Sequence, residues 1–158
     1  MGLVNHDGGN TFRIINETLH EDLGYQVETQ ILDSADFGVP QHRRRIYIVG
    51  IKVGEGEKVN FKWPEPKLDK VGIGRYIESD VTGYSISKHL QNSYMYKLDD
   101  GRPQVVDKNS DFPVKTLVST YHKIQRLTGT FVKGGETGLR LLSHNECKAI
   151  MGLSLIHI

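Results

Sequence analysis

The sequence contains a single cysteine among its 158 residues, so no internal disulfide can form. This scarcity fits a reducing, cytoplasmic setting. No apolar run is long enough to cross a bilayer. Strong charge of either sign is also missing, because 20 Lys and Arg stand against 19 Asp and Glu and leave a net charge of +1. Any affinity for a polyanion must therefore come from local clustering of basic residues.

The remaining composition is that of a folded domain, with 37% hydrophobic and 25% charged residues. The seven histidines show neither the close helical spacing nor the accompanying cysteines of a metal site, so we expect no bound metal. A helix is predicted after Asn10, a good N-cap, and Gly24 is placed as its C-terminal stop. Between them, apolar residues recur at helical spacing: Phe12, Ile15, Leu19 and Leu23.

Two short strands are predicted over residues 27–32 and 46–51, the second apolar on both faces as inside a covered α/β sheet. The amino-acid composition changes after Lys52, because residues 54–58 form a polar turn and residues 63–66 contain two prolines. This change predicts a domain boundary near residue 53. From there to about Gly138 we expect a small irregular domain. Ser143 with Glu146 forms a capping box, which predicts a helix through Met151.

Three consecutive arginines, Arg43, Arg44 and Arg45, stand immediately before the apolar strand 46–51. Arginine stays charged and offers a planar fork of donors that matches phosphate oxygens and base edges, so this cluster favours a nucleic-acid partner. A solvated strand end is the alternative interpretation of a basic triplet. The residues around the triplet help to decide between the two.

Residues 37–50 resemble the F/Y-G-V-P-Q-x-R-x-R-hydrophobic signature of the DNA (cytosine-5) methyltransferases. Residues 138–152 are similar to the later R-x-L-x-x-x-E-C-x-x-x-x-G segment of the same family. The resemblance spans nearly the whole chain and fails only over the last five residues. The cofactor loop and the Pro-Cys nucleophile motif of that family lie upstream of the matched segments, and no Pro-Cys pair occurs in this sequence.

The resemblance implies an α/β fold: the C-terminal part of a doubly wound, Rossmann-like methyltransferase domain plus a small, irregular, mainly β target-recognition domain. We expect residues 1–52 to belong to the catalytic domain and residues 53–138 to the target-recognition domain. Residues 139–153 would return to the catalytic domain, and residues 154–158 are interpreted as a non-native tail. S-adenosylmethionine is expected as cofactor of the parent enzyme, with its site outside this fragment.

The catalytic residues implied by the resemblance are Arg45 and Arg43. Arg45 matches the arginine that approaches the cytosine carbonyl oxygen and stabilises charge developing on the ring, and Arg43 has a supporting role. Arg44 falls at the variable position, and strand alternation should turn it to the opposite, solvated side. Cys147 matches a structural cysteine in the later segment, so we do not expect it to be the nucleophile.

Sequence choice is expected in the middle domain, where residues 115–123 resemble the Thr-Leu recognition segment of the family. Arg126 and Gln125 are the expected readers of base edges, and Lys123 is an expected phosphate contact. Alternatively, Thr116 anchors the loop, and His122, Lys123 and Arg126 form a solvated rim. The complete set of expected DNA-binding residues is Gln41, Thr116, Ser119, Tyr121, His122, Lys123, Gln125 and Arg126.

The sequence thus predicts a fragment of a bacterial or phage-encoded cytoplasmic enzyme of restriction-modification. Its partners would be double-stranded DNA, with neither membrane nor metal, and the missing N-terminal half of the same enzyme. The intact enzyme would methylate carbon 5 of a flipped cytosine in a specific site, whereas the isolated fragment would be inactive. The alternatives are a fragment of a transfer-RNA cytosine methyltransferase and a non-catalytic DNA-binding module.

Overall fold

The computed structural model describes residues 2–54, 56–66 and 69–153. The chain forms two compact units: Met1–Asp33 with Arg44–Pro66, and Ser34–Arg43 with Lys67–Ile158. The chain thus leaves the first unit after Asp33 and returns to it at Arg44, within the P-Q-x-R-x-R motif. The expected tail, 154–158, lies outside the described residues. Within them, no helix is long and apolar enough to cross a membrane.

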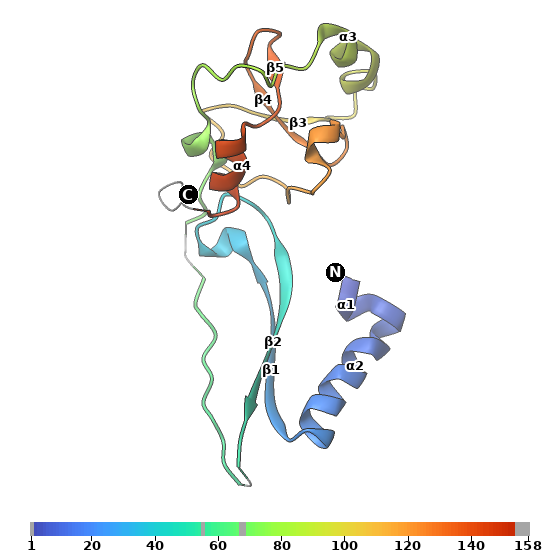
Figure 1. Ribbon diagram of the computed structural model, residues 1–158, viewed down its shortest axis with the longest axis vertical. Coiled ribbons are helices and arrows are strands. Elements are labelled where there is room, and N and C mark those ends of the chain that lie inside the picture. The colour runs from blue at the N-terminus through green and yellow to red at the C-terminus, as the bar shows by residue number, and fades with distance from the viewer. Residues whose placement is uncertain (1, 55, 67–68, 154–158) are drawn as a thin grey trace. The chain divides into compact units, whose positions relative to one another are not determined.

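The first unit begins with helical segments (Figure 1). Helix α1 spans Gly2–Asn5, a 3-10 turn covers His6–Gly9, α2 spans Asn10–Glu17, and a π-helical turn continues over Thr18–Asp22. The predicted helix is confirmed, but Asn10 is its first residue and Gly9 occupies the N-cap, with no side-chain cap hydrogen bond. Gly24 ends the helical segment as predicted, at a left-handed φ of +63° that glycine adopts without strain.

Strands β1 (Tyr25–Asp33) and β2 (Arg44–Lys52) pair antiparallel in a register that runs from Tyr25↔Lys52 to Asp33↔Arg44. Both predicted strands are confirmed, and both are longer than predicted. The expectation that β2 is buried on both faces is wrong for the described residues, because none of its residues is buried. Among the described residues this sheet has two strands, and no residue of α2 is buried, so large side chains such as Tyr47 (49% exposed) stay open to water.

The second unit is built on a three-stranded sheet in the order β3-β4-β5, with β3 (Gln104–Val106) parallel and β5 (Leu139–Arg140) antiparallel to β4 (Thr130–Lys133). Successive side chains of a strand point to opposite faces. Accordingly, Phe131 joins one apolar cluster and Val132 the other. The first contains Ile86, Met95, Phe131 and Leu139; the second contains Ile73, Ile77, Val106, Val114, Val132, Leu142 and Ile150.

Short helical pieces complete this unit. They are the 3-10 turns Ser34–Phe37, Ile73–Tyr76 and Tyr121–Lys123, helix α3 (Lys88–Leu90) with a π-helical turn over Gln91–Met95, and helix α4 (His144–Ile150). The predicted capping box of α4 is confirmed: Ser143 Oγ accepts from the Glu146 N–H (3.1 Å), and Glu146 Oε2 accepts from the Ser143 N–H (2.7 Å). Mixed helix and sheet place the chain in the α/β class.

Candidate nucleic-acid interface

The arginine cluster begins strand β2. Arg44 and Arg45 are successive residues of the strand, so their side chains leave on opposite faces. Arg44 reaches Asp33, with 3.4 Å between Nε and Oδ2, while its own side chain stays 68% exposed. Arg45 is exposed, and its Nη1 donates to the carbonyl of Arg44 (2.7 Å). Arg43 is also exposed and belongs to the second unit. Both expected catalytic arginines therefore carry accessible side chains.

Gln41 lies in the interior of the second unit, only 1% exposed. Its Nε2 donates to the carbonyl of Ile150 (3.2 Å), and its Oε1 accepts from the Leu117 N–H (2.8 Å). One amide therefore ties the P-Q-x-R turn to the recognition segment and to the end of α4. Although Gln41 was expected to bind DNA, the structure places it away from the exposed surface, where it orders the turn.

Two further expected contacts face inward. The Thr116 hydroxyl donates to the carbonyl of His42 (2.5 Å), as expected of a residue that anchors the loop. The Tyr121 hydroxyl donates to the carbonyl of Thr130 (2.5 Å) and accepts from the Leu142 N–H (2.8 Å). Burial raises the pKa of Tyr121 far above its usual value. These hydroxyls hold the recognition segment from inside.

Arg126 differs most from its expected position. It is 5% exposed, so neither a solvated rim nor a protruding reader describes it. Its Nε donates to the carbonyl of Met95 (2.7 Å), Nη1 donates to Asp100 Oδ2 (2.9 Å), and Nη2 donates to the carbonyl of Leu98 (2.9 Å). Nη2 also bonds Asp100 Oδ1. These hydrogen bonds from Arg126 lower the pKa of Asp100.

The remaining expected contacts lie on one segment, residues 119–128, which we call the recognition loop. Ser119, His122 and Lys123 are exposed. Gln125 is half-buried: its Nε2 donates to Thr120 Oγ1 (3.2 Å), and its Oε1 accepts from Thr128 Oγ1 (2.9 Å). The structure thus divides the expected set into three groups: the exposed Ser119, His122 and Lys123, the half-buried Gln125, and the inward-facing Gln41, Thr116, Tyr121 and Arg126.

Cys147 lies in α4 and packs against the Val132 cluster. Burial raises the pKa of its thiol to about 11, with Glu146 adding a smaller effect of the same sign. A thiol with so high a pKa is almost entirely protonated at neutral pH, and the thiolate is the nucleophilic form. The geometry therefore agrees with a structural role for this cysteine.

Two residues of the later family segment, Arg140 and Glu146, form a buried ion pair that was not predicted from the sequence. Arg140 and Glu146 are 4% and 0% exposed, and their side chains join in a fork at 2.7 Å for both Nη1–Oε2 and Nη2–Oε1. Glu146 Oε1 also accepts from the Glu78 N–H (2.8 Å). The spacing of Arg and Glu around a capping serine was visible in the sequence, but no local rule predicts that pairing.

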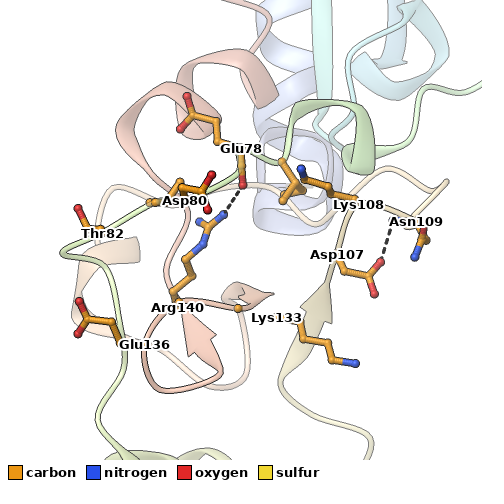
Figure 2. Close-up of a pocket in the computed structure, with 13 residues that line it drawn as sticks. Glu78, Asp80, Thr82, Asp107, Lys108, Asn109, Lys133, Glu136 and Arg140 are labelled. Atoms are coloured by element: carbon orange, nitrogen blue, oxygen red, sulfur yellow. Dashed lines mark hydrogen bonds between the residues drawn. The ribbon is translucent and has the colours of Figure 1, made fainter.

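A hollow of about 580 Å³ lies in the second unit beside Arg140 (Figure 2). Figure 2 shows the Arg140 guanidinium directed to the carbonyl of Glu78, and Nη2 donates to that carbonyl at 3.4 Å. Four of the lining residues carry carboxylates and three carry positive charge: Glu78, Asp80, Asp107 and Glu136 against Lys108, Lys133 and Arg140. This lining has no excess of positive charge that would attract phosphate, so we place no DNA contact in this hollow. Among the described residues, no group of His, Cys, Asp and Glu side chains could hold a metal ion.

The first unit also has a hollow, of about 510 Å³. It is lined by residues at the start of β1 and beyond the end of β2, including Tyr25 and Val53. Arg45 stands at the other end of the ladder, seven residues before Lys52, or roughly 23 Å at about 3.3 Å per residue. If Arg45 approaches the target base, as the resemblance implies, a methyl donor bound in this hollow would be far from that base, so the hollow does not fit S-adenosylmethionine.

The family described as C-5 cytosine-specific DNA methylase matches residues 1–155, and the chain belongs to this family. The chain is 60% identical over 151 residues to the type II methyltransferase M.MspI of Moraxella sp., covering 96% of this chain and 35% of that protein. It is 53% identical over 152 residues to M.BsuFI of Bacillus subtilis, covering 96% and 37%. The chain therefore spans little more than a third of these relatives.

Two solved structures share the fold. A methyltransferase of Entamoeba histolytica, EhMeth, superposes with a TM-score of 0.62 over 91% of this chain and 46% of that one, at 20% identity. The Dnmt2 methyltransferase of S. pombe gives 0.67 over 96% and 51%, at 19% identity. At such identities the likeness concerns the fold alone, and it confirms the predicted fold class.

Proposed function

We propose that the chain is the C-terminal part of a DNA (cytosine-5) methyltransferase of restriction-modification, active in the bacterial cytoplasm in its intact form. That form transfers a methyl group from S-adenosylmethionine to carbon 5 of a flipped cytosine in a specific duplex site. The observation that carries this proposal is the family match over residues 1–155 together with 60% identity to a type II methyltransferase. The nucleophile and the cofactor site belong to the rest of the enzyme.

The open apolar surface of the first unit supports the proposal of a missing partner segment. Its large apolar side chains are about half exposed: Ile14 (48%), Leu23 (47%) and Tyr47 (49%). Apolar side chains contribute most when they are removed from water, and isolated two-stranded ladders are only marginally stable. In the intact enzyme we expect the N-terminal half to cover these strands and helices.

The role proposed for Arg45 follows from chemistry and accessibility. A cytosine that is attacked at carbon 6 gathers negative charge on its ring and carbonyl oxygen, and a fixed guanidinium beside that oxygen lowers the barrier. Arg45 offers such a group on an exposed face of β2. Arg43 has the supporting role. S-adenosylmethionine supplies the methyl group when it is bound by the rest of the enzyme.

In the proposed DNA interface, the recognition loop presents Ser119, His122, Lys123 and Gln125 to the duplex. Lys123 and His122 suit phosphate oxygens, whereas the amide of Gln125 suits a base edge. Of the inward-facing members of the expected set, Tyr121 and Arg126 hold this loop from the interior, and Gln41 and Thr116 fix residues 116 and 117 just before it.

The first experiment tests whether the cofactor site lies outside this chain, as proposed. Calorimetric titration of the isolated chain with S-adenosylmethionine is expected to show no saturable binding. Saturation at micromolar cofactor would place the cofactor site within this chain and contradict the proposal.

The second experiment tests the residue roles in a chimera. The matching segment of M.MspI, 60% identical, is replaced by this chain, and methyl transfer and duplex binding are measured. Arg45→Ala should lower the transfer rate far more than the affinity. Lys123→Ala should lower the affinity for duplexes of any sequence and reduce the slope of log affinity against log salt concentration by about one unit.

Arg44→Ala is the control, because the Arg44 side chain lies on the face of β2 opposite to that of Arg45. Equal effects of Arg45→Ala and Lys123→Ala on rate and binding would show that the roles are wrong.

Substrate choice decides between this proposal and its alternatives. Methylation of duplex DNA by the active chimera supports the DNA enzyme, whereas methylation of transfer RNA would support the RNA enzyme. A non-catalytic DNA-binding module would be indicated by a genomic reading frame without an upstream Pro-Cys motif.

A further inference from the structure

The acceptors of the Arg126 side chain all belong to one segment of the chain. They are the carbonyls of Met95, Leu98 and Arg102 and the carboxylate of Asp100. A buried guanidinium is tolerated only when its donors are satisfied and its charge is paired, and both conditions are met here. The Arg126 side chain is thus hydrogen-bonded to residues 95–102, which we call the bracing loop.

The bracing loop has little else to hold it. After the buried Met95, every residue from Tyr96 to Arg102 is exposed, including Leu98 at 61%. A segment without buried apolar side chains gains little from packing, so its conformation depends on hydrogen bonds. Within the loop, the Arg102 N–H donates to Asp100 Oδ1 (3.1 Å), which leaves Asp100 in contact with both Arg126 and its own loop.

On its other side, Arg126 belongs to the recognition loop and directly follows Gln125. Ile124, one residue earlier, adopts a left-handed φ of +53°, a conformation that β-branched residues avoid. Its side chain packs against the Phe131 cluster. Two successive anchors, the apolar side chain of Ile124 and the guanidinium of Arg126, therefore flank Gln125.

We propose that Arg126 is a positioning residue: through Asp100 it couples the bracing loop to the recognition loop, and sequence preference depends on this coupling although Arg126 touches no base. The functional part of this inference rests on the proposed DNA interface. The coupling itself is a property of the chain alone. Both parts are tested with variants that keep the size of the side chain.

Asp100→Asn is the central variant, because it keeps the shape of the side chain and removes the charge that pairs with Arg126. Asp99→Asn is the matched control: it makes the same change in the same loop, and no hydrogen bond joins Asp99 to Arg126 in the part of the chain that the structure describes. Arg126→Lys keeps the positive charge but loses the planar pair of donors that binds Asp100, so its effects on hydrogen exchange and site preference should resemble those of Asp100→Asn. Circular dichroism confirms that each variant is folded.

Amide hydrogen exchange on the whole chain tests the coupling without DNA. A lost charge-assisted hydrogen bond corresponds to about a tenfold change in local opening. We expect Asp100→Asn to speed exchange about tenfold in both loops, residues 95–102 and 119–128, while Asp99→Asn leaves both near wild type. Faster exchange confined to residues 95–102, or equal behaviour of the two variants, would overturn the coupling.

Selection of binding sites from a random duplex pool tests the functional part. Asp100→Asn and Arg126→Lys should weaken preference at several positions of the selected site, and Asp99→Asn should keep the wild-type preference. A change at one position in Arg126→Lys, with none in Asp100→Asn, would make Arg126 a direct reader and overturn the inference. If the wild-type chain selects no site, the proposed DNA interface fails and the functional part fails with it, whereas the exchange result still decides the coupling.

Discussion

Removing the carboxylate of Glu146 is expected to destabilise the second unit severely. Glu146→Ala leaves the Arg140 guanidinium buried at 4% exposure without its partner, and it leaves the N–H groups of Glu78 and Ser143 without their acceptor. Breaking a buried ion pair by removing one partner costs about 3–5 kcal/mol. The loss also opens the capping box of α4. We therefore expect a loss of roughly 4 kcal/mol, a large share of the ~5–15 kcal/mol that stabilises a typical domain.

Urea unfolding, followed by circular dichroism, measures this loss. With a slope of about 2 kcal/mol per molar urea, the midpoint should fall by roughly 2 M. Glu136→Ala is the matched control, because this exposed glutamate carries the same charge outside the core and should change stability by less than about 0.5 kcal/mol. A loss below about 1 kcal/mol for Glu146→Ala would show that the ion pair contributes little and refute the reasoning.

Two further substitutions and one reactivity measurement probe other parts of the chain. Gln41→Leu should lower the free energy of unfolding by about 2–4 kcal/mol in urea titration, because it leaves the Ile150 carbonyl and the Leu117 N–H without hydrogen-bond partners. An unchanged midpoint would show that these two hydrogen bonds do not stabilise the chain. Gly74→Ala should destabilise by about 1–3 kcal/mol, since a Cβ there would stand 2.3 Å from the Lys108 carbonyl oxygen, whereas Gly2→Ala, with open space around it, should be neutral in the same titration. Burial raises the pKa of the Cys147 thiol from 9.0 to about 11, so Cys147 should react with iodoacetamide about a hundredfold more slowly than a free thiol does. The contribution of the protonated thiol to the free energy of unfolding should be complete below pH 9 and lost as the pH rises towards 11. Rapid alkylation of the folded chain at pH 8 would contradict that burial.

The predictions that the structure confirmed rest on local patterns. Helical spacing up to Gly24, the two apolar strands and the Ser143–Glu146 capping box all involve neighbours within a few residues, where backbone preferences act directly. Family membership was predictable for a related reason, because its signatures are contiguous stretches of sequence. The functional roles of the arginines and of the recognition loop stay predictions.

What only the tertiary structure decided is which polar side chains face water. Gln41 finds its partners 76 and 109 positions away, and Arg126 finds Asp100 26 positions away. No periodicity spans such distances, so Arg126 and Lys123 look alike in the sequence although one is buried and the other exposed. Burial of β2 was overestimated for the same reason: the sequence shows that a strand is apolar, but only the assembled chain shows what covers it. Local chemistry determines the elements and the family, whereas long-range pairing determines which residues remain free to meet a ligand.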